Sequence, residues 1–240
     1  MSRFHSPRRR RGFVLPLAVA ASFGTASTAR AVTFNGNATL TTDYVWRGIT
    51  QSDGDPAAQA GFKVSGDTGF YASVWGSSVK FAPELDASTE LDLTLGWSTS
   101  LADDWAVDVN VLRYQYPGTA VDVNWTELNG TLTYRNKYWL SAGWSNEALG
   151  YDRSGLYTQV GARFPLNDQF RLEAMVSHYF LSRAVVARSG YTHAQVNAIW
   201  AFHAPFELRL SGHATDSDAK AIFGDDVADS RAEAALQASF

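Results

Sequence analysis

The sequence has no cysteine and, beyond its N-terminal region, no long hydrophobic run. The lack of cysteine excludes disulfide bonds, thiolate-bound zinc and thiol nucleophiles. A bundle of membrane-spanning helices is also excluded, because each would need an apolar run of about 18 residues or more. The mean hydropathy of -0.18 is compatible with a membrane barrel, whose alternating strands average near zero.

Basic charge is scarce after residue 31. Six of the 20 basic residues lie in the first 31 positions, which hold no acidic residue, so residues 32–240 carry 14 basic and 24 acidic side chains, a net charge of -10. Such a chain lacks the basic surface that nucleic acids or anionic lipids require, and we expect no nucleic-acid partner. With 45% hydrophobic and 13% aromatic residues, it is too apolar for disorder.

The first 31 residues have the features of an export signal. A basic segment at 8–11 precedes an apolar segment at 13–21, and Ala29-Arg30-Ala31 forms a small-residue cleavage site. We expect a secretory signal at 1–31, cleaved after Ala31, and one domain at 32–240. Arg10-Arg11 resembles a twin-arginine signal only faintly, so the ordinary secretory route is favoured.

The mature region follows an alternation of period two, rich in aromatic and β-branched residues. In one segment Leu91, Leu93 and Leu95 alternate with Asp92 and Thr94. This pattern is typical of strands with one apolar and one polar face. Twelve such segments are expected at 38–48, 58–65, 70–74, 90–98, 105–111, 127–134, 138–145, 156–164, 170–177, 193–202, 206–213 and 232–240.

Short and long connections alternate between these segments. Short turns fall at 66–68, 101–104, 135–137, 165–169 and 203–205, and the longer links lie between them. Membrane barrels show this asymmetry, whereas a soluble sandwich, the alternative, does not require it. We therefore predict an all-β fold, a single antiparallel transmembrane β-barrel of about 12 strands. Both termini lie at the short-turn side, which after export would be the periplasm.

Aromatic residues cluster where the expected strands end, as an interfacial girdle requires. Those beside the short turns predict an inner girdle: Trp97, Trp105, Tyr134, Tyr138, Phe164, Phe170, Phe202 and Phe206. Those near the longer links predict an outer girdle: Tyr44, Trp46, Tyr114, Trp125, Trp144, Tyr157 and Tyr191. The last strand closes on Phe240, which is typical of the signal that hands outer-membrane barrels to their assembly machinery.

Several short motifs resemble the TorF family of porins. They are Asp43-Tyr44-Val45-Trp46-Arg47-Gly48-Ile49 with Pro56 and Gln59, Gly69-Phe70-Tyr71-Ala72, Val74-Trp75-Gly76-Ser77, Glu90-Leu91-Asp92, Tyr114 with Tyr116-Pro117-Gly118, and Glu127. Trp46 stands where that family's pattern has Phe. The resemblance is clearest over residues 40–127, and it implies an outer-membrane barrel of the porin type in a Gram-negative bacterium.

Charged residues fall on the polar faces of the expected strands and would line the lumen. The acidic ones are Asp43, Glu90, Asp92, Asp108, Glu127, Glu173, Glu207 and Glu233, and the basic ones are Arg47, Lys63, Arg163, Arg171 and Arg209. The acidic excess predicts a mild preference for cations if the lumen conducts. Asp43 and Arg47, four residues apart on the first expected strand, would form either part of a charged constriction or a self-satisfying interior network.

The sequence favours a porin or channel for passive diffusion and transport of ions or small solutes. The alternatives are a non-conducting structural or surface-recognition barrel and, third, a barrel enzyme. His178, His193 and His213 are the candidate bases for hydrolysis, but no hydrolase motif accompanies them, so we expect no catalytic residue.

No metal or cofactor is expected either. Acidic residues gather in the last long link at Asp216, Asp218, Asp225, Asp226 and Asp229, but they lack the spacing of a calcium loop and are interpreted as a solvated loop. The expected partners are outer-membrane lipids, the barrel assembly machinery and the diffusing solutes. The oligomeric state stays open.

Overall fold

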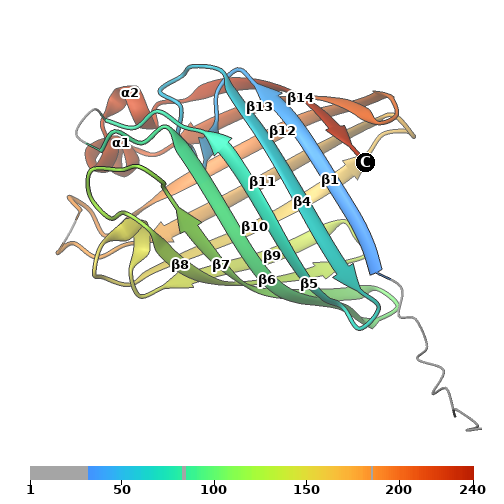
Figure 1. The fold of residues 1–240 in the computed structure, drawn as a ribbon. Coiled ribbons are helices and arrows are strands. Elements are labelled where there is room, and N and C mark those ends of the chain that lie inside the picture. Colours follow the sequence, from blue (N-terminus) through green and yellow to red (C-terminus); the bar gives the residue numbers. More distant parts are fainter. Residues whose placement is uncertain (1–31, 83–84, 185) are drawn as a thin grey trace, which may run out of the picture.

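The computed structural model describes residues 32–82, 85–184 and 186–240, and the expected export signal lies outside them. Within these residues twelve antiparallel strands close into one barrel (Figure 1). They are β1 (Val32–Thr41), β4 (Ala57–Gly66), β5 (Phe70–Ser78), β6 (Thr89–Ala102), β7 (Trp105–Gln115), β8 (Trp125–Tyr134), β9 (Tyr138–Ser145), β10 (Gly155–Pro165), β11 (Phe170–Phe180), β12 (Gly190–His203), β13 (Phe206–Thr215) and β14 (Arg231–Ser239). Each strand pairs with the next along the chain, and β1 pairs with β14 to complete the ring. The predicted fold class is confirmed.

The alternation in sequence becomes an apolar outside and a polar inside. On β6, Leu93 and Leu95 are 42% and 69% exposed on the outer wall, whereas Glu90 is buried inside. Leu95 lies opposite Ala72 of β5 and Val111 of β7, which continue the apolar face. A single-residue slip would reverse both faces, so the pattern fixes the register.

The two ends of the barrel differ in the way the sequence predicted. Val32 pairs with Gly66 at the end of β4, and Phe240 bonds to Gly36, so both ends of the described chain lie at the short-turn end. The long connections gather at the opposite end, where Figure 1 shows the two short helices. These are α1 (Ser217–Phe223) and α2 (Asp225–Ala228), and a 3-10 turn, η1 (Ala148–Gly150), lies in another long loop.

Neither helix was expected from the sequence, because each is too short to show a helical period. The side chain of Asp216 caps α1 by accepting from the backbone N–H groups of Asp218 and Ala219. Among the described residues, no helix is long and apolar enough to cross a membrane.

The predicted first strand, 38–48, is wrong in its second half. The strand β1 ends at Thr41, and the following segment forms a small hairpin, β2 (Val45–Trp46) with β3 (Ile49–Thr50). The turn consists of Arg47 and Gly48, both with positive φ, at 50° and 83°. Two consecutive residues of positive φ are what a two-residue hairpin turn of type I′ requires. The chain therefore reverses and enters the barrel where the alternation alone predicted a continuous wall strand.

The aromatic residues near the short turns lie where the inner girdle was predicted. Trp105, Tyr138, Phe164 and Phe170 are each more than 40% exposed on the outer wall at this end. Phe202 stacks on Phe206 across the turn that joins β12 and β13.

The predicted outer girdle is largely wrong. Of its seven residues, Trp144 alone is strongly exposed, and Tyr44, Tyr114, Trp125, Tyr157 and Tyr191 are buried inside the barrel. Trp46 packs against three clusters of buried apolar side chains inside the barrel. The reason is that alternate residues of a strand face opposite sides of the wall. Tyr114 lies opposite Asp92 and Trp125 and shares their inward face. The main core of the molecule is therefore within the lumen at the long-loop end.

Candidate functional site in the barrel lumen

The hairpin β2–β3 crosses the lumen and is fastened to the far wall by Arg47. The hairpin arises between β1 and β4, whereas Glu127 is on β8, and β5, β6 and β7 stand between them in the ring. The Arg47 guanidinium bonds to both carboxylate oxygens of Glu127, with Nη2–Oε1 at 2.7 Å and Nη1–Oε2 at 3.0 Å. Their side chains are 9% and 1% exposed. Such a bidentate geometry is specific to arginine.

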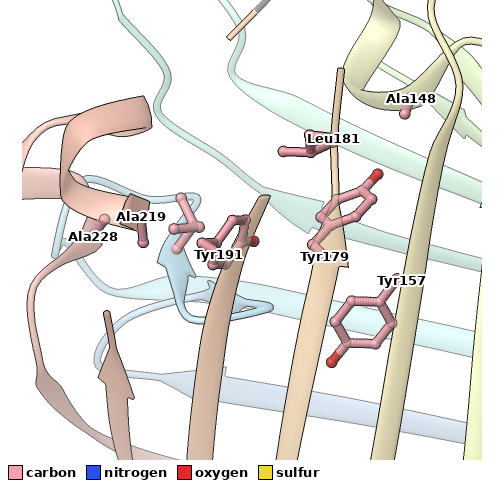
Figure 2. Close-up of a cluster of buried hydrophobic side chains, with 8 residues drawn as sticks. Ala148, Tyr157, Tyr179, Leu181, Tyr191, Ala219 and Ala228 are labelled. Carbon is pink, nitrogen blue, oxygen red and sulfur yellow. The ribbon is translucent and has the colours of Figure 1, made fainter. Parts of the chain in front are cut away.

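Aromatic rings surround this ion pair. The Arg47 Cζ atom lies 3.9 Å from the ring centre of Tyr157, 4.3 Å from that of Trp46 and 4.9 Å from that of Tyr179. The hydroxyl of Tyr191 donates to the backbone oxygen of Arg47 at 3.1 Å. Figure 2 shows Tyr157, Tyr179 and Tyr191 on neighbouring strands, β10, β11 and β12. Cation–π contacts of this kind stabilise a desolvated guanidinium.

The Arg47 guanidinium remains charged in this environment. Burial lowers its pKa, but the adjacent Glu127 carboxylate more than offsets this, and the pKa ends above its ordinary value. A buried ion pair adds little net stability over an apolar pair, yet removing one partner leaves a costly unpaired charge. The pair therefore holds the hairpin in one position across the lumen.

The start of the hairpin segment is anchored separately, through Asp43. Its Oδ2 accepts from Arg231 at 2.7 Å, and its Oδ1 accepts from the hydroxyls of Thr50 at 2.6 Å and Ser52 at 3.0 Å. Asp43 and Arg47 thus do not lie two pleats apart on one strand, as predicted, because the turn separates them. Sequence reasoning missed Arg231, which begins β14 directly after the helical loop, because the expected last strand began one residue later, at Ala232.

A chain of polar side chains lines the wall beside the hairpin. His193 Nε2 lies 3.3 Å from His213 Nδ1, and His213 Nε2 lies 3.2 Å from Glu233 Oε2. Glu233 Oε1 in turn accepts from Thr41 at 2.8 Å. Gly48 packs directly on this wall, since a Cβ there would collide with His193 and Thr215. The histidine side chains thus serve as part of the surface that receives the turn of the hairpin.

Among the described residues, the side chains of His178, His193 and His213 form no hydrogen bond with a serine hydroxyl. The hydroxyl of Ser177 donates to the backbone oxygen of His193, and His178 contacts the hydroxyl of Thr192 through Nδ1. In the described part of the chain, no group of three or more histidine, aspartate or glutamate side chains has the geometry to hold a metal ion.

Two predicted lumen acids, Glu90 and Asp92, lie together on β6 close to the hairpin. The hydroxyl of Tyr44 donates to Glu90 Oε1 at 3.3 Å. Asp92 is in register with Trp75 of β5 and Tyr114 of β7. Glu90 Oε2 and Asp92 Oδ1 are buried without a hydrogen-bond partner among the described residues.

The other predicted lumen charges lie toward the short-turn end, where they form a belt across the inner wall. Arg163 Nε bonds to Glu173 Oε1 at 2.7 Å, and Arg171 Nη1 lies 3.1 Å from Glu207 Oε2. Arg209 Nη2 lies 3.6 Å from Glu207 Oε1.

Lys63 and Asp108 meet through Tyr71 in the same half of the barrel. The Lys63 ammonium stands 3.5 Å from the ring centre of Tyr71, and the Tyr71 hydroxyl donates to Asp108 at 2.9 Å. Each predicted lumen residue is thus inside the barrel or on the hairpin within it, and Arg231 joins them. The acidic excess is confined to the half that holds Asp43, Glu90, Asp92, Glu127 and Glu233.

The long-loop end opens into a cavity of about 790 Å³. Its lining is mainly aromatic and aliphatic and includes Trp46 of the hairpin and Trp125 of β8. These two rings meet at 6.0 Å between centres. A solute entering from this end would therefore meet an apolar vestibule before it reached the Arg47–Glu127 pair.

Comparisons with known proteins place the fold among porin barrels. The structure of the NanC porin shares 10% identity with this chain at a TM-score of 0.55, covering 87% of this chain and 99% of NanC. The KdgM porin in complex with disordered oligogalacturonate shares 5% identity at a TM-score of 0.55, covering 88% of this chain and 99% of KdgM. At these identities the likeness shows the fold alone.

Sequence comparison gives a family without a known activity. No curated protein matches the chain. The porin-type barrel implied by the TorF resemblance agrees with the structural neighbours, but no comparison supports the TorF name itself. The model of the Gcw_chp family, described as a bacterial protein of unknown function, matches residues 25–240. The chain belongs to the Gcw_chp family.

Proposed function

We propose that this protein is a bacterial outer-membrane channel that lets ions or small solutes diffuse passively, with a mild preference for cations. The observation that carries the proposal is that the closed barrel wall is apolar on its outer face and polar on its inner face. Large apolar side chains cover the outside, and ionisable side chains occupy the inside. A closed barrel leaves no unpaired strand edge in lipid, and a charged interior is useful when water fills it.

The same wall supports a proposed placement of the chain in the membrane. Aromatic side chains ring the short-turn end, as at a membrane interface. We assign this end to the periplasm, because exported barrels have their short turns there. The leader 1–31 would then be removed after Ala31, and the assembly machinery and outer-membrane lipids would be the first partners.

The charge distribution supports cations over anions as the preferred ions. Among the described residues, the half of the lumen at the long-loop end holds five acidic side chains against Arg47 and Arg231. Carboxylates lining a pore favour cations. KdgM, which shares the fold, is described in complex with an acidic oligosaccharide, but the acidic outer half of this lumen would repel such a ligand. We therefore propose small cations or neutral solutes.

Single-channel recording in a planar bilayer tests the proposal. Protein purified from membranes is added across a KCl gradient, and folding is checked by its heat-dependent mobility on a gel. Discrete current steps with a cation-favouring reversal potential are expected. An anion-favouring potential would contradict the proposed selectivity.

The hairpin across the lumen favours one alternative, a barrel that does not conduct in its resting state. Arg47 and Glu127 fasten the hairpin among buried aromatic rings. Folded protein that gave no current, either alone or after the hairpin is released, would contradict the channel. A structural or surface-recognition barrel would then be the better account, and its long loops would be the binding surface to test.

A further inference from the structure

Glu90 and Asp92 place two carboxylates side by side on β6, and neither has a basic partner in the described part of the chain. They are alternate residues on the inward face of β6, and Glu90 is 1% exposed. Glu90 Oε2 and Asp92 Oδ1 both lack a hydrogen-bond partner among the described residues. Buried polar atoms are nearly always paired, so an orphaned oxygen calls for an unseen water, proton or ion.

The two basic side chains that anchor the hairpin are already engaged with other carboxylates. Arg47 binds Glu127, and Arg231 binds Asp43, each at 2.7 Å. Within the described ranges, no lysine or arginine forms an ion pair with either carboxylate. Two neighbouring buried charges of the same sign repel each other and are costly unless a shared proton or a positive charge compensates them.

The other groups at this position suit a cation. The Tyr44 hydroxyl lies 3.3 Å from Glu90 Oε1, which places a third oxygen beside the pair. Tyr44 also packs edge-on against Trp75, with 5.5 Å between ring centres, and Trp75 is in register with Asp92. Aromatic rings tolerate a neighbouring cation and offer it their electron-rich faces.

We propose that Glu90 and Asp92 bind one divalent cation of the Ca²⁺ class in the lumen. A divalent charge neutralises both carboxylates, and Ca²⁺ accepts oxygen ligands in an irregular arrangement completed by water. With only two carboxylates the site would bind weakly and exchange its ion, as suits a place on a diffusion path. The inference deepens the proposed channel function, because the ion would occupy the acidic half of the lumen, but binding can be measured without any current.

Terbium luminescence gives a direct test. Tb³⁺ replaces Ca²⁺ at oxygen sites, and its emission is excited through nearby aromatic rings, here Trp75, Tyr44 and Tyr114. The purified protein in detergent is titrated with Tb³⁺, and the bound ion is then displaced with Ca²⁺. We expect saturable emission that Ca²⁺ removes.

The Glu90→Gln/Asp92→Asn double variant supplies the decisive comparison. It keeps the shapes of both side chains and removes their repulsion, so the barrel should fold, which its mobility on a gel would show. Its emission should fall at least about tenfold at equal Tb³⁺, in line with the dependence of Ca²⁺ affinity on ligand charge. The matched control is Asp122→Asn/Asp226→Asn, which removes two carboxylates from the aromatic vestibule and should keep the emission.

Two results would overturn the proposal. One is unchanged emission from the double variant. The other is folded wild-type protein without saturable emission, which would assign a shared proton, not a metal ion, to the pair. Loss of the channel function alone would look different, because a protein silent in bilayers could still bind Tb³⁺ at this pair.

Discussion

At the residue scale, Arg47 determines both the fold of the segment around it and the contact of that segment with the opposite wall. Its left-handed backbone turns the hairpin, its carbonyl accepts from Tyr191, and its guanidinium pairs with Glu127. Lysine could not reproduce this, because its point charge cannot bond to both carboxylate oxygens in parallel. One side chain thus joins a local turn to a contact across the barrel.

Replacing Arg47 with alanine should release the hairpin. The change leaves Glu127 charged, buried and unpaired, a penalty of about 3 to 5 kcal/mol for comparable buried pairs. Undocking the hairpin hydrates that carboxylate, so we expect a larger single-channel conductance and faster protease cleavage within residues 42–56. Single-channel recording and timed proteolysis measure both effects.

Two further variants control this experiment. The double variant Arg47→Ala/Glu127→Gln also removes the unpaired charge of the Glu127 carboxylate and should restore part of the packing of the hairpin inside the barrel. Lys80→Ala removes exposed pairs with Asp53 and Asp55 and should change little, because such pairs contribute little. If Arg47→Ala leaves both conductance and cleavage at wild-type values, the hairpin is not held by this pair.

The sequence predicted which residues are charged and inside, but not how they pair. The segment from Tyr44 to Ile49 alternates like a strand, and only the positive φ of Arg47 and Gly48 reverses it. Pairs such as Asp43 with Arg231 join residues 188 apart in the chain, so no local pattern could reveal them. The positions of the buried tyrosines were predicted wrongly for a related reason. Aromatic residues suit both a lipid interface and a packed lumen, and only the face of the strand on which a residue lies separates the two.

At the scale of elements, the alternation of apolar and polar residues was sufficient to predict the strands of the barrel wall. The alternation in β6 predicted outward Leu93 and inward Thr94, and the exposure and register of this strand agree. The twelve strands and both classes of connection could be predicted because each depends on a repeated local pattern. The helices α1 and α2 have only seven and four residues, too few for a pattern to appear.

An arginine on each face of β6 tests the membrane assignment. Leu93→Arg places a charge in lipid near the bilayer midplane and should cost about 2 to 4 kcal/mol of folding free energy. Thr94→Arg, one residue along the same strand, faces the lumen and should cost less. Equilibrium unfolding in urea from lipid vesicles measures both. Equal losses of stability would refute the assigned faces.

At the scale of the whole molecule, the barrel is closed by the pairing of its first and last strands, β1 and β14. Phe240 completes this seam, because its N–H donates to Gly36 O at 2.9 Å and its C=O accepts from Gly36 N at 2.6 Å. Its ring covers Gly36, where a Cβ would collide with it. The proposed assembly signal is therefore also a structural contact, and the two roles need to be separated.

Deleting Phe240 should slow formation of the closed barrel, because the last pair of backbone bonds in the seam is lost. Phe240→Ala keeps those bonds and removes only the ring. We expect the deletion to slow folding both into lipid vesicles and in cells, as followed by the appearance of the heat-resistant form on gels. If the assembly machinery reads the ring, Phe240→Ala will fold at the wild-type rate in vesicles but accumulate slowly in the outer membrane. Unchanged rates for both variants in both settings would remove Phe240 from the assembly process.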